Sequence, residues 1–353
     1  MNNQNIFEKM QDRNIHRIRR SDSPNQKTVI CEYIWIGGAG EIRSKIRVFT
    51  TDEDVMQEWN FDGSSTGQTE HGEADTEIIL KPRKIYYHPC LTSSNDARIV
   101  LCDTWYPDGS PHPTNHRHKA EEWFSSPEIK ELHPWFGLEQ EYFLMKNWMG
   151  KNYEQDGTHY CGQGLVSDER KIVEEHLHAC IQAGLKISGL NAEVANHQWE
   201  FQIGPAEGIR AGDDMTVARF LLQRCAEKYE YNVLYHPKPC ATVNGSGCHI
   251  NYSTAPMRIP GIGIEKINEA IKNLSEFHCE TIAYYGEFNH LRLTGKHETG
   301  AMDKFTYGVG TRNTSIRIPN STLANGGGYF EDRRPAANID PYEATYKLSK
   351  HSH

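Results

Sequence analysis

HPWFGLEQEYFLMKN (residues 133–147) and NAEVANHQWEFQIGP (residues 191–205) decide how this chain folds. The first stretch predicts one long strand, because aromatic and apolar residues alternate with polar ones along it. In the second, Trp199, Phe201 and Ile203 form one apolar face. We expect a turn around residues 195–197, so the second stretch would make two strands. Both stretches carry glutamates among apolar residues, which is unusual for a strand.

Helical patterns surround these strands and predict a large body of mixed helices and strands. We expect helices at 118–126, 167–185, 213–231 and 264–286, and further strands at 247–254 and 314–320. Asp168 or Ser167 would cap the second of these helices, and Gly184 lies near its end.

The region before this body is rich in β-branched and aromatic residues. TVICEYIWI (28–36) and IRSKIRVF (42–49) predict two strands joined by the GGAGE turn. The segment YPDGSPHPTNHRH (106–118) is dense in proline, glycine and asparagine, so we expect a flexible domain boundary there. The domains predicted are a polar arm at 1–26, a small β domain at 27–108 and a larger domain at 109–353.

Composition excludes several classes of protein. The formal net charge of −9 leaves no basic surplus for a phosphate backbone, so nucleic acid is not an expected partner. No apolar run approaches the roughly 20 residues that span a bilayer, and the first residues lack a signal-peptide core, so no membrane is expected either. Nine scattered cysteines without a CxxC pair predict reduced thiols and a cytoplasmic location.

The first chemical signal is a pair of glutamates, Glu139 and Glu141. Residues two apart on a strand share a face, so their carboxylates would repel each other beside apolar neighbours. A divalent cation would relieve that repulsion, and oxygen ligands suit magnesium or manganese. The simpler interpretation is an exposed strand end, where glutamates cost nothing.

Four more residues could complete an acidic cavity. Glu193 and Glu200 would converge if the predicted turn separates them, and His249 follows a glycine-rich turn. Glu331 lies beside a basic pair, and a surface ion pair is its simpler interpretation. Each signal is weak alone, but four segments that bring acids or a histidine to β-rich surroundings point together to metal binding.

Arginines supply the complementary charge. Arg292, Arg312, Arg317, Arg333 and Arg334 follow in the C-terminal third of the chain. Arginine binds carboxylate and phosphate oxygens through two parallel hydrogen bonds, so an acidic metal site with arginines around it is typical of phosphoryl transfer. No GxxxxGK[ST] loop is present, and GGAGEIR (37–43) lacks the third glycine of a dinucleotide motif. His116 and His118 lie in the proline-rich segment, where we expect a solvated loop rather than a zinc site.

Seven segments together resemble the signatures of eukaryotic-type (type II) glutamine synthetases, in the same order. They are FDGSSTGQ, GLEQEY, NAEVANHQWEFQIGP, NGSGCHINYST, RLTGKHET, TRNTSIRIP and YFEDRRPAANIDPY. The resemblance spans about Tyr33 to Tyr342. It implies an α+β fold with an N-terminal β-grasp domain and a catalytic domain built on a curved antiparallel sheet flanked by helices. It also implies a homo-oligomer of two stacked pentameric rings, with active sites between subunits.

The implied activity joins ammonia to the γ-carboxylate of L-glutamate through γ-glutamyl phosphate, with ATP as a substrate and two or three Mg²⁺ or Mn²⁺ ions in each active site. The resemblance assigns one metal ion to Glu141, Glu193 and Glu200. It assigns another to Glu139, His249 and Glu331.

The same resemblance implies roles for the remaining candidates. Glutamate would contact Asn244, Gly245 and Arg292. ATP phosphates would contact Arg312 and Arg317, Trp135 and Tyr329 would lie near the nucleotide, and Arg333 would contact the transferred phosphoryl group. Glu298 would sit on a flap over the intermediate, and Asp62 of the adjoining subunit would bind and deprotonate ammonium.

Two other functions compete with this one: a ligase that joins glutamate to a different amine, and a non-catalytic relative. The second is disfavoured because every acid, histidine and arginine of the pattern is present. Asp62 and Glu298 favour ammonium, since two carboxylates suit a small cation. Three departures from the family pattern bear on loop shape and assembly: Gly37, Val243 and the 153–162 loop.

Overall fold

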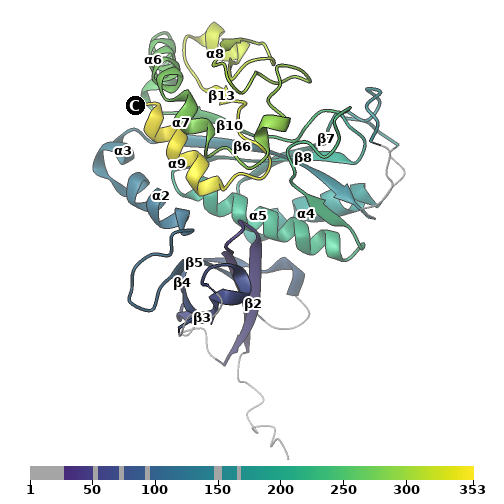
Figure 1. Cartoon of the computed structure of the whole chain (residues 1–353), viewed down its shortest axis with the longest axis vertical. Coiled ribbons are helices and arrows are strands. Elements are labelled where there is room, and N and C mark those ends of the chain that lie inside the picture. The colour runs from purple at the N-terminus through teal and green to yellow at the C-terminus, as the bar shows by residue number, and fades with distance from the viewer. Residues whose placement is uncertain (1–27, 51–54, 71–74, 92–95, 147–152, 165–167) are drawn as a thin grey trace, which may run out of the picture.

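The computed structural model describes residues 28–50, 55–70, 75–91, 96–146, 153–164 and 168–353. It contains two β-sheets, with helices packed between them and around the larger one (Figure 1). The predicted arm at 1–26 lies outside the described residues, as does Ser167.

The smaller sheet has five strands in the order β2-β1-β5-β4-β3. The strands are β1 (Val29–Ile36), β2 (Ile42–Phe49), β3 (Trp59–Asp62), β4 (Glu77–Tyr87) and β5 (Asp96–Trp105). β1 pairs in parallel with β5, and the other neighbours are antiparallel. The alternation of β1 places Cys31, Tyr33 and Trp35 in a core of this sheet, as expected of a strand with two covered faces.

The larger sheet has eight strands, seven of them in the order β11-β12-β13-β10-β6-β8-β7, and β9 pairs with β6. They are β6 (Trp135–Met145), β7 (Ile187–Ala192), β8 (Gln198–Glu207), β9 (Asn232–Leu234), β10 (Cys248–Ser253), β11 (Tyr307–Val309), β12 (Ile316–Ile318) and β13 (Phe330–Asp332). The sheet is curled, and the pairs are antiparallel except β11 and β12, which run in parallel at its edge. The turn predicted around 195–197 separates β7 from β8.

The helices of the described residues are α2 (His116–Ser125), α3 (Pro127–Glu131), α4 (Glu169–Ala183), α5 (Arg210–Glu227), α6 (Gly263–Glu276), α7 (His278–Ile282), α8 (Asn320–Asn325) and α9 (Pro341–His351). Of these, α4 and α5 pack directly against strands of the larger sheet. Short 3₁₀ turns lie at Gly63–Thr66, Pro89–Leu91, Pro256–Arg258 and Asn289–Leu291. Among the described residues, no helix is long and apolar enough to cross a membrane. Trp199, Phe201 and Ile203 of β8 enter the main core as predicted.

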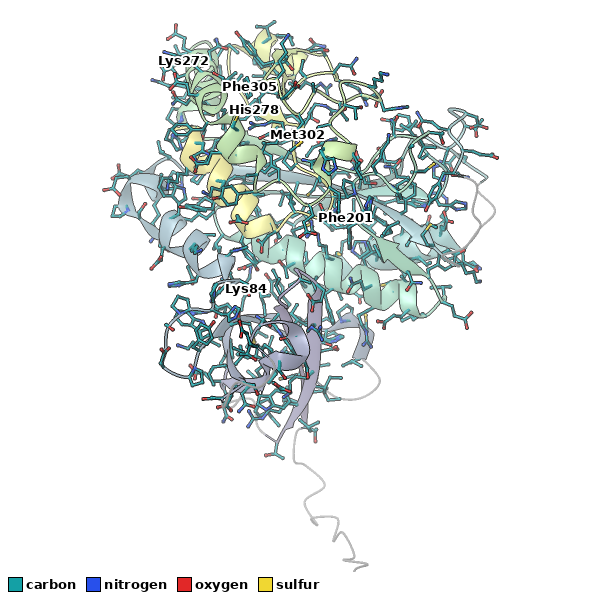
Figure 2. All side chains as sticks on the ribbon, in the orientation of Figure 1. Lys84, Phe201, Lys272, His278, Met302 and Phe305 are labelled. Carbon is teal, nitrogen blue, oxygen red and sulfur yellow. The ribbon has the colours of Figure 1, made fainter. Side chains whose placement is uncertain are left out.

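Helix α5 also joins the two sheets. Tyr86 of β4 donates a hydrogen bond to Asp214 of α5 over 3.2 Å, and the Lys84 ammonium lies 3.5 Å from the same carboxylate. Figure 2 shows Lys84 at this junction. A carboxylate buried under two donors ties the small sheet to the helical layer.

The segment 106–118 is not the flexible boundary that its composition predicted. The His112 ring contacts the Gln68 carbonyl over 2.8 Å, and Asn115 donates to the Thr104 carbonyl over 2.9 Å. Asn115 also caps α2. The prolines fix the backbone, and buried polar side chains satisfy it, so the segment is a packed spacer.

Two further expectations were wrong in detail. His116 and His118 begin α2 rather than lying in a solvated loop, and the His116 ring contacts Asp340 over 3.0 Å. The helix predicted at 264–286 breaks at Phe277 into α6 and α7. The break lets the Phe277 ring stack on His351 of α9, with centroids 4.9 Å apart. Packing against α9 therefore overrides the local helical pattern.

Candidate active site

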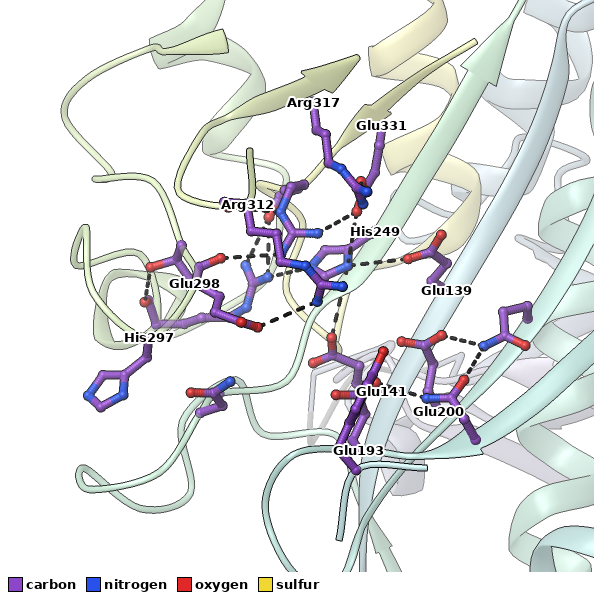
Figure 3. A pocket seen from close by; sticks show the side chains of 18 residues that line it. Glu139, Glu141, Glu193, Glu200, His249, His297, Glu298, Arg312, Arg317 and Glu331 are labelled. Atoms are coloured by element: carbon purple, nitrogen blue, oxygen red, sulfur yellow. Dashed lines mark hydrogen bonds and ion pairs between the residues drawn. The ribbon is translucent and has the colours of Figure 1, made fainter. Parts of the chain in front are cut away.

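A polar cavity of about 310 Å³ opens at the curled face of the larger sheet (Figure 3). Its lining brings together six acids, two histidines and four arginines: Glu139, Glu141, Glu193, Glu200, Glu298, Glu331, His249, His297, Arg292, Arg312, Arg317 and Arg333. Asn244 and Gly245 also line the cavity. All of these residues except His297 were predicted from the sequence, so thirteen predicted site residues lie in one cavity. Acids and arginines this concentrated are typical of a site that binds anions through cations.

Strand register places the acids side by side. Glu141 of β6 lies opposite Glu200 of β8, and Glu139 lies opposite His249 of β10. Directly opposed residues share a face with their Cβ atoms about 5 Å apart. β13 adds Glu331, which pairs in register with Arg317 of β12. Four adjacent strands thus direct their polar residues into the same space.

Glu139, His249 and Glu331 form a compact group. One ligand atom from each lies within 4.8 Å of the others. The Nδ1 atom of His249 is 3.6 Å from a carboxylate oxygen of Glu139 and 3.6 Å from one of Glu331. Burial, with Arg333 and Arg292 nearby, lowers the pKa of His249 well below its usual range, so its ring is neutral. A neutral imidazole with two carboxylates is a set of metal ligands.

Glu141, Glu193 and Glu200 form a second group beside it (Figure 3). Burial raises the pKa of Glu141 to about 8, and the charge of Glu193 adds to the rise. Burial also raises the pKa of Glu200 to about 9, with Glu139 and Glu141 as repelling neighbours, and it raises the pKa of Glu193. The three acids therefore share a space in which they cannot all ionise alone.

The donor set fits divalent cations. A bound divalent cation would let the crowded carboxylates ionise together, because its charge offsets their mutual repulsion. Five of the six candidate ligands are carboxylates, and oxygen ligands suit magnesium and manganese. Neighbouring amides already orient the acids: Asn191 donates to Glu193 over 2.9 Å, Gln202 donates to Glu200, and the Gly247 N–H donates to Glu141 over 2.7 Å.

Arg333 is held between the two walls of the cavity. Its guanidinium donates to Glu331 over 2.5 Å, to the Arg312 carbonyl over 3.0 Å and to the Glu298 carbonyl over 3.2 Å. Arg317 also contacts Glu331 over 3.1 Å. Glu331 is therefore a buried carboxylate between two arginines, and the surface ion pair that its sequence context suggested is not what the structure shows.

Arg292 is a buried cation whose hydrogen bonds do not neutralise it. Only 3% of its surface is exposed. Its guanidinium lies 3.2 Å from the Arg333 carbonyl and 2.8 Å from the Nε2 atom of His249. Burial lowers the pKa of Arg292 to about 10, so it stays charged near neutral pH. A carboxylate entering the cavity would compensate this charge.

The glycine-rich turn 244–247 lies against Arg292. A Cβ atom on Gly245 would lie 2.3 Å from the Pro237 carbonyl oxygen, and one on Gly247 would lie 2.5 Å from the Arg292 guanidinium. Only glycine allows this approach. Asn244, the first residue of this turn, lines the same cavity as Arg292.

Glu298 lies on a strained backbone at the mouth of the cavity. His297 and Glu298 both have left-handed backbone angles, with φ of 53° and 62°. The Glu298 carboxylate is 3.7 Å from the guanidinium of Arg312, and both side chains are about half exposed. Strain in a non-glycine pair at a site is a mark of functional constraint.

A second, more apolar cavity of about 450 Å³ adjoins the first. Trp135 and Tyr329 line it, and Glu139 and Gln202 line both cavities. The Arg258 guanidinium lies over the Trp135 ring, 4.0 Å from its centroid. Half-exposed aromatic rings can stack on a planar base, and the arginine-lined cavity beside them could bind the attached phosphates.

Asp62 is the one predicted residue placed apart from both cavities. It lies at the end of β3 in the smaller sheet and caps the 3₁₀ turn that follows. Hydrogen bonds from Ser64 lower the pKa of Asp62, so its exposed carboxylate is ionised. Within the described part of one chain, Asp62 lines neither cavity.

Sequence reasoning assigned no role to several polar residues around the acids. Asn191 and Gln202 line the cavity, and Gln198 donates to the Gly245 carbonyl over 3.0 Å and to Ser246 over 3.1 Å. Tyr160 lines the cavity beside Arg312. An available signal was the alternation in β8, which puts Gln198 and Gln202 on the same face as Glu200.

The chain is similar to glutamine synthetases over most of its length. Residues 114–345 match the family model described as glutamine synthetase, catalytic domain. A putative glutamine synthetase of Acanthamoeba polyphaga mimivirus is 47% identical over 342 residues, covering 92% of this chain and 95% of that protein. Glutamine synthetase cytosolic isozyme 1-3 of Arabidopsis thaliana is 47% identical over 336 residues, covering 91% and 94%. The chloroplastic glutamine synthetase of Brassica napus is 47% identical over 341 residues, covering 93% and 78%.

Proposed function

The chain belongs to the glutamine synthetase family, and from this premise we propose how its two adjoining cavities carry out the reaction of a glutamate–ammonia ligase. The enzyme uses ATP and divalent metal ions. It transfers the γ-phosphoryl group of ATP to the γ-carboxylate of L-glutamate, and ammonia then displaces phosphate from γ-glutamyl phosphate to give L-glutamine. The products are glutamine, ADP and phosphate.

We assign two divalent ions to the acidic cavity. The resemblance to the family implies two or three ions in each active site, so a third is compatible with it. Glu141, Glu193 and Glu200 would hold one, and Glu139, His249 and Glu331 would hold the other. Mg²⁺ is our first choice and Mn²⁺ the second, because five of the six ligands are carboxylates. Bound there, the ions would neutralise phosphate charge and orient the reacting oxygens.

Arginines would bind the phosphates from the other wall. Arg312 and Arg317 approach from β12 and the loop before it, and Arg333 is fixed beside Glu331. A cation held by three acceptors needs no rearrangement when negative charge builds on the transferred phosphoryl group. Trp135 and Tyr329 would hold the nucleotide base in the adjoining cavity, which places its phosphates toward Glu139.

Glutamate would bind at the glycine-rich turn. Arg292 offers the buried positive charge that a carboxylate would compensate. Asn244 and Gly245 lie beside it and leave room for backbone-close contact. The γ-carboxylate would then face the ions and Arg333, because all of these residues line the same cavity.

Ammonium would bind between two carboxylates, Glu298 and Asp62. Glu298 is already at the cavity mouth, whereas Asp62 lies on the smaller sheet of its own chain. We therefore propose that Asp62 enters the site of the next subunit, as in a head-to-tail ring. The assembly would be a homodecamer of two stacked pentameric rings. Its small domain (27–108) would be a β-grasp and its catalytic domain would span 109–353.

We place the protein in the cytoplasm. Two of its relatives are named cytosolic isozymes, in Arabidopsis thaliana and Oryza sativa, and others are named chloroplastic. The nine cysteines all lie among the described residues and form no disulfide there, which is consistent with a reducing compartment.

One observation supports this function most strongly. Six potential metal ligands and four arginines line one cavity of a protein that belongs to this family. The test is to incubate the purified protein with ATP, Mg²⁺ and glutamate, together with ammonium or with a panel of primary amines. Glutamine and stoichiometric phosphate are expected with ammonium. A strong preference for another amine would favour the related γ-glutamyl-amine ligase, and no turnover with any acceptor would favour a non-catalytic relative.

A further inference from the structure

The loop 153–162 forms a wall behind the acidic cavity. It is anchored to the turn between β7 and β8, where the Asn196 N–H donates to the Glu154 carbonyl over 3.0 Å and the Cys161 N–H donates to the Ala192 carbonyl over 3.0 Å. The His159 ring contacts the Glu193 carbonyl over 2.7 Å. The loop is therefore held in a defined position next to Glu193, one of the proposed metal ligands.

One residue of this loop contacts the glycine-rich turn. The Oε1 atom of Gln155 accepts a hydrogen bond from the Asn244 backbone N–H over 2.6 Å, and its Nε2 atom donates to the Asn244 side-chain Oδ1 over 3.1 Å. Both ends of the Gln155 amide are thus engaged by the same residue. Gln155 itself is exposed and does not line the cavity, whereas Asn244 does and is only 9% exposed.

This pairing selects one orientation of the Asn244 amide. An asparagine amide can present either its carbonyl oxygen or its NH₂ group in a given direction, and its partners decide which. Here the oxygen faces the Gln155 donor. The NH₂ group is left for the cavity, where a donor suits a carboxylate and an acceptor would repel it.

We propose that Gln155 is a positioning residue that fixes the amide of Asn244, so that the cavity offers an N–H donor to a carboxylate of glutamate. This inference rests on the proposed function, because it takes glutamate as the molecule that Asn244 contacts. Gln155 touches neither substrate nor metal. It acts through Asn244 alone, and its effect should therefore fall on glutamate and not on ATP.

The main test is Gln155→Met, which keeps the bulk of the side chain, adds no charge and removes both hydrogen bonds. We expect the KM for glutamate to rise about tenfold, the size of one lost charge-assisted hydrogen bond, with kcat changed less than about twofold and the KM for ATP unchanged. The matched control is Thr158→Ala in the same loop. It removes the Thr158 hydroxyl bond to Asp156 and leaves Asn244 untouched, so both KM values should stay at the wild-type level.

Gln155→Glu distinguishes orientation from simple support. It still accepts from the Asn244 backbone N–H, but it would draw the Asn244 NH₂ toward itself and turn the carbonyl to the cavity. A merely structural role predicts that this isostere is milder than Met, whereas an orienting role predicts that it raises the KM for glutamate further. The KM of Gln155→Glu for glutamate is measured at about 0.05 M and 0.5 M salt. High salt screens the added negative charge, whereas an effect of amide orientation persists.

Three outcomes would overturn the inference: an unchanged KM for glutamate in Gln155→Met, an equal rise in the KM for ATP, or a Glu variant milder than the Met variant at high salt. Wild-type turnover is measured first. Absence of glutamine formation by the wild type would defeat the proposed function instead. In that case glutamate binding by calorimetry, wild type against Gln155→Met, would still decide the role of Gln155.

Discussion

Arg333 is a cation of the cavity whose guanidinium is already held in place before any substrate binds. Three acceptors, one of them the Glu331 carboxylate, hold its guanidinium against the cavity. Removing the side chain should leave the fold intact, because Arg317 still pairs with Glu331 over 3.1 Å. We expect Arg333→Ala to lower kcat about 10²- to 10³-fold, as loss of a fixed group that stabilises transition-state charge does.

Turnover and circular dichroism measured on the same preparation check this expectation. Arg258→Ala is the matched control, since it removes an arginine that contacts Trp135 at the adjoining cavity and not Glu331. It should change the KM for ATP more than kcat. A folded Arg333→Ala enzyme with near-normal kcat would show that Arg333 has no part in phosphoryl transfer.

The crowded acids of the cavity should make the protein respond to metal in its stability. Burial and mutual repulsion keep Glu141 and Glu200 protonated near neutral pH when no cation is present. The neutral isostere Glu200→Gln should therefore unfold within about 1 °C of the wild type in chelator. Added Mg²⁺ should raise the wild-type midpoint by at least about 2 °C and the variant by much less. A scan of thermal unfolding in chelator and in Mg²⁺ measures both, and an equal response of the two proteins to Mg²⁺ would contradict the assignment of Glu200 as a ligand.

At the scale of residues, spacing alone predicted part of this site. The two-residue interval placed Glu139 and Glu141 on one face of a strand, and the structure shows them there. Register between strands could not be predicted, because it depends on which long-range pairs bury the most apolar surface. His249 opposite Glu139 is such a pair, and neither residue alone signalled it. The amides Gln198 and Gln202 were assigned no role, because the alternation in β8 gives the strand face that they share with Glu200 but not the groups that they bind.

Helix α4 carries a buried histidine that should tie stability to pH. His176 contacts the Ala218 carbonyl over 2.9 Å and packs edge-on against Phe201. Burial lowers its pKa from 6.5 to about 4. The unfolded chain therefore binds more protons between these two values, and stability is fully present above pH 6.5 and lost as pH falls toward 4.

The slope from this one group is at most about 1.4 kcal/mol for each pH unit. We expect His176→Gln, which can still donate to Ala218, to lose less stability than the wild type between pH 6.5 and 4.5. Urea midpoints at several pH values measure the difference between the two proteins, in which contributions of other groups cancel. Parallel pH profiles would show that His176 does not titrate on unfolding in this range.

At the scale of elements, long patterned segments were predicted well and junctions were not. The strand at 133–147 and the helices at 167–185 and 213–231 appear as β6, α4 and α5, because each has enough apolar periodicity to outweigh local exceptions. The prediction of a flexible segment at 106–118 was wrong, because prolines and a glycine indicate only that the backbone turns. Whether such a segment is loose depends on tertiary partners, and here Gln68 and Thr104 supply them.

At the scale of the whole molecule, the small sheet is held in one position relative to the large one. Tyr86 of β4 donates to Asp214 of α5, and the Arg224 guanidinium of α5 lies 3.8 Å from the Glu32 carboxylate of β1. These contacts leave Asp62 on a sheet that a packed spacer, and not a loose linker, connects to the rest of the chain. Asp62 lines neither cavity of its own chain, and the small sheet that carries it is fixed in place. We therefore propose that its carboxylate serves the active site of a neighbouring subunit.

That arrangement makes a specific prediction about mixtures of inactive chains. Asp62→Ala removes the carboxylate that one subunit would lend, and Glu141→Ala removes a metal ligand of the subunit that receives it, so each variant alone should be inactive. After mild dissociation and reassembly at equal amounts, about one quarter of the sites should pair an intact Asp62 with an intact Glu141, and activity should return to about one quarter of the wild type. Mixing Glu141→Ala with Glu200→Ala is the control, because both changes fall in the same cavity of one chain and no arrangement of those subunits rebuilds a site. Subunit exchange is followed by size and by a tag on one variant. If exchange is demonstrated and the first mixture stays as inactive as the control, each active site must be complete within a single chain.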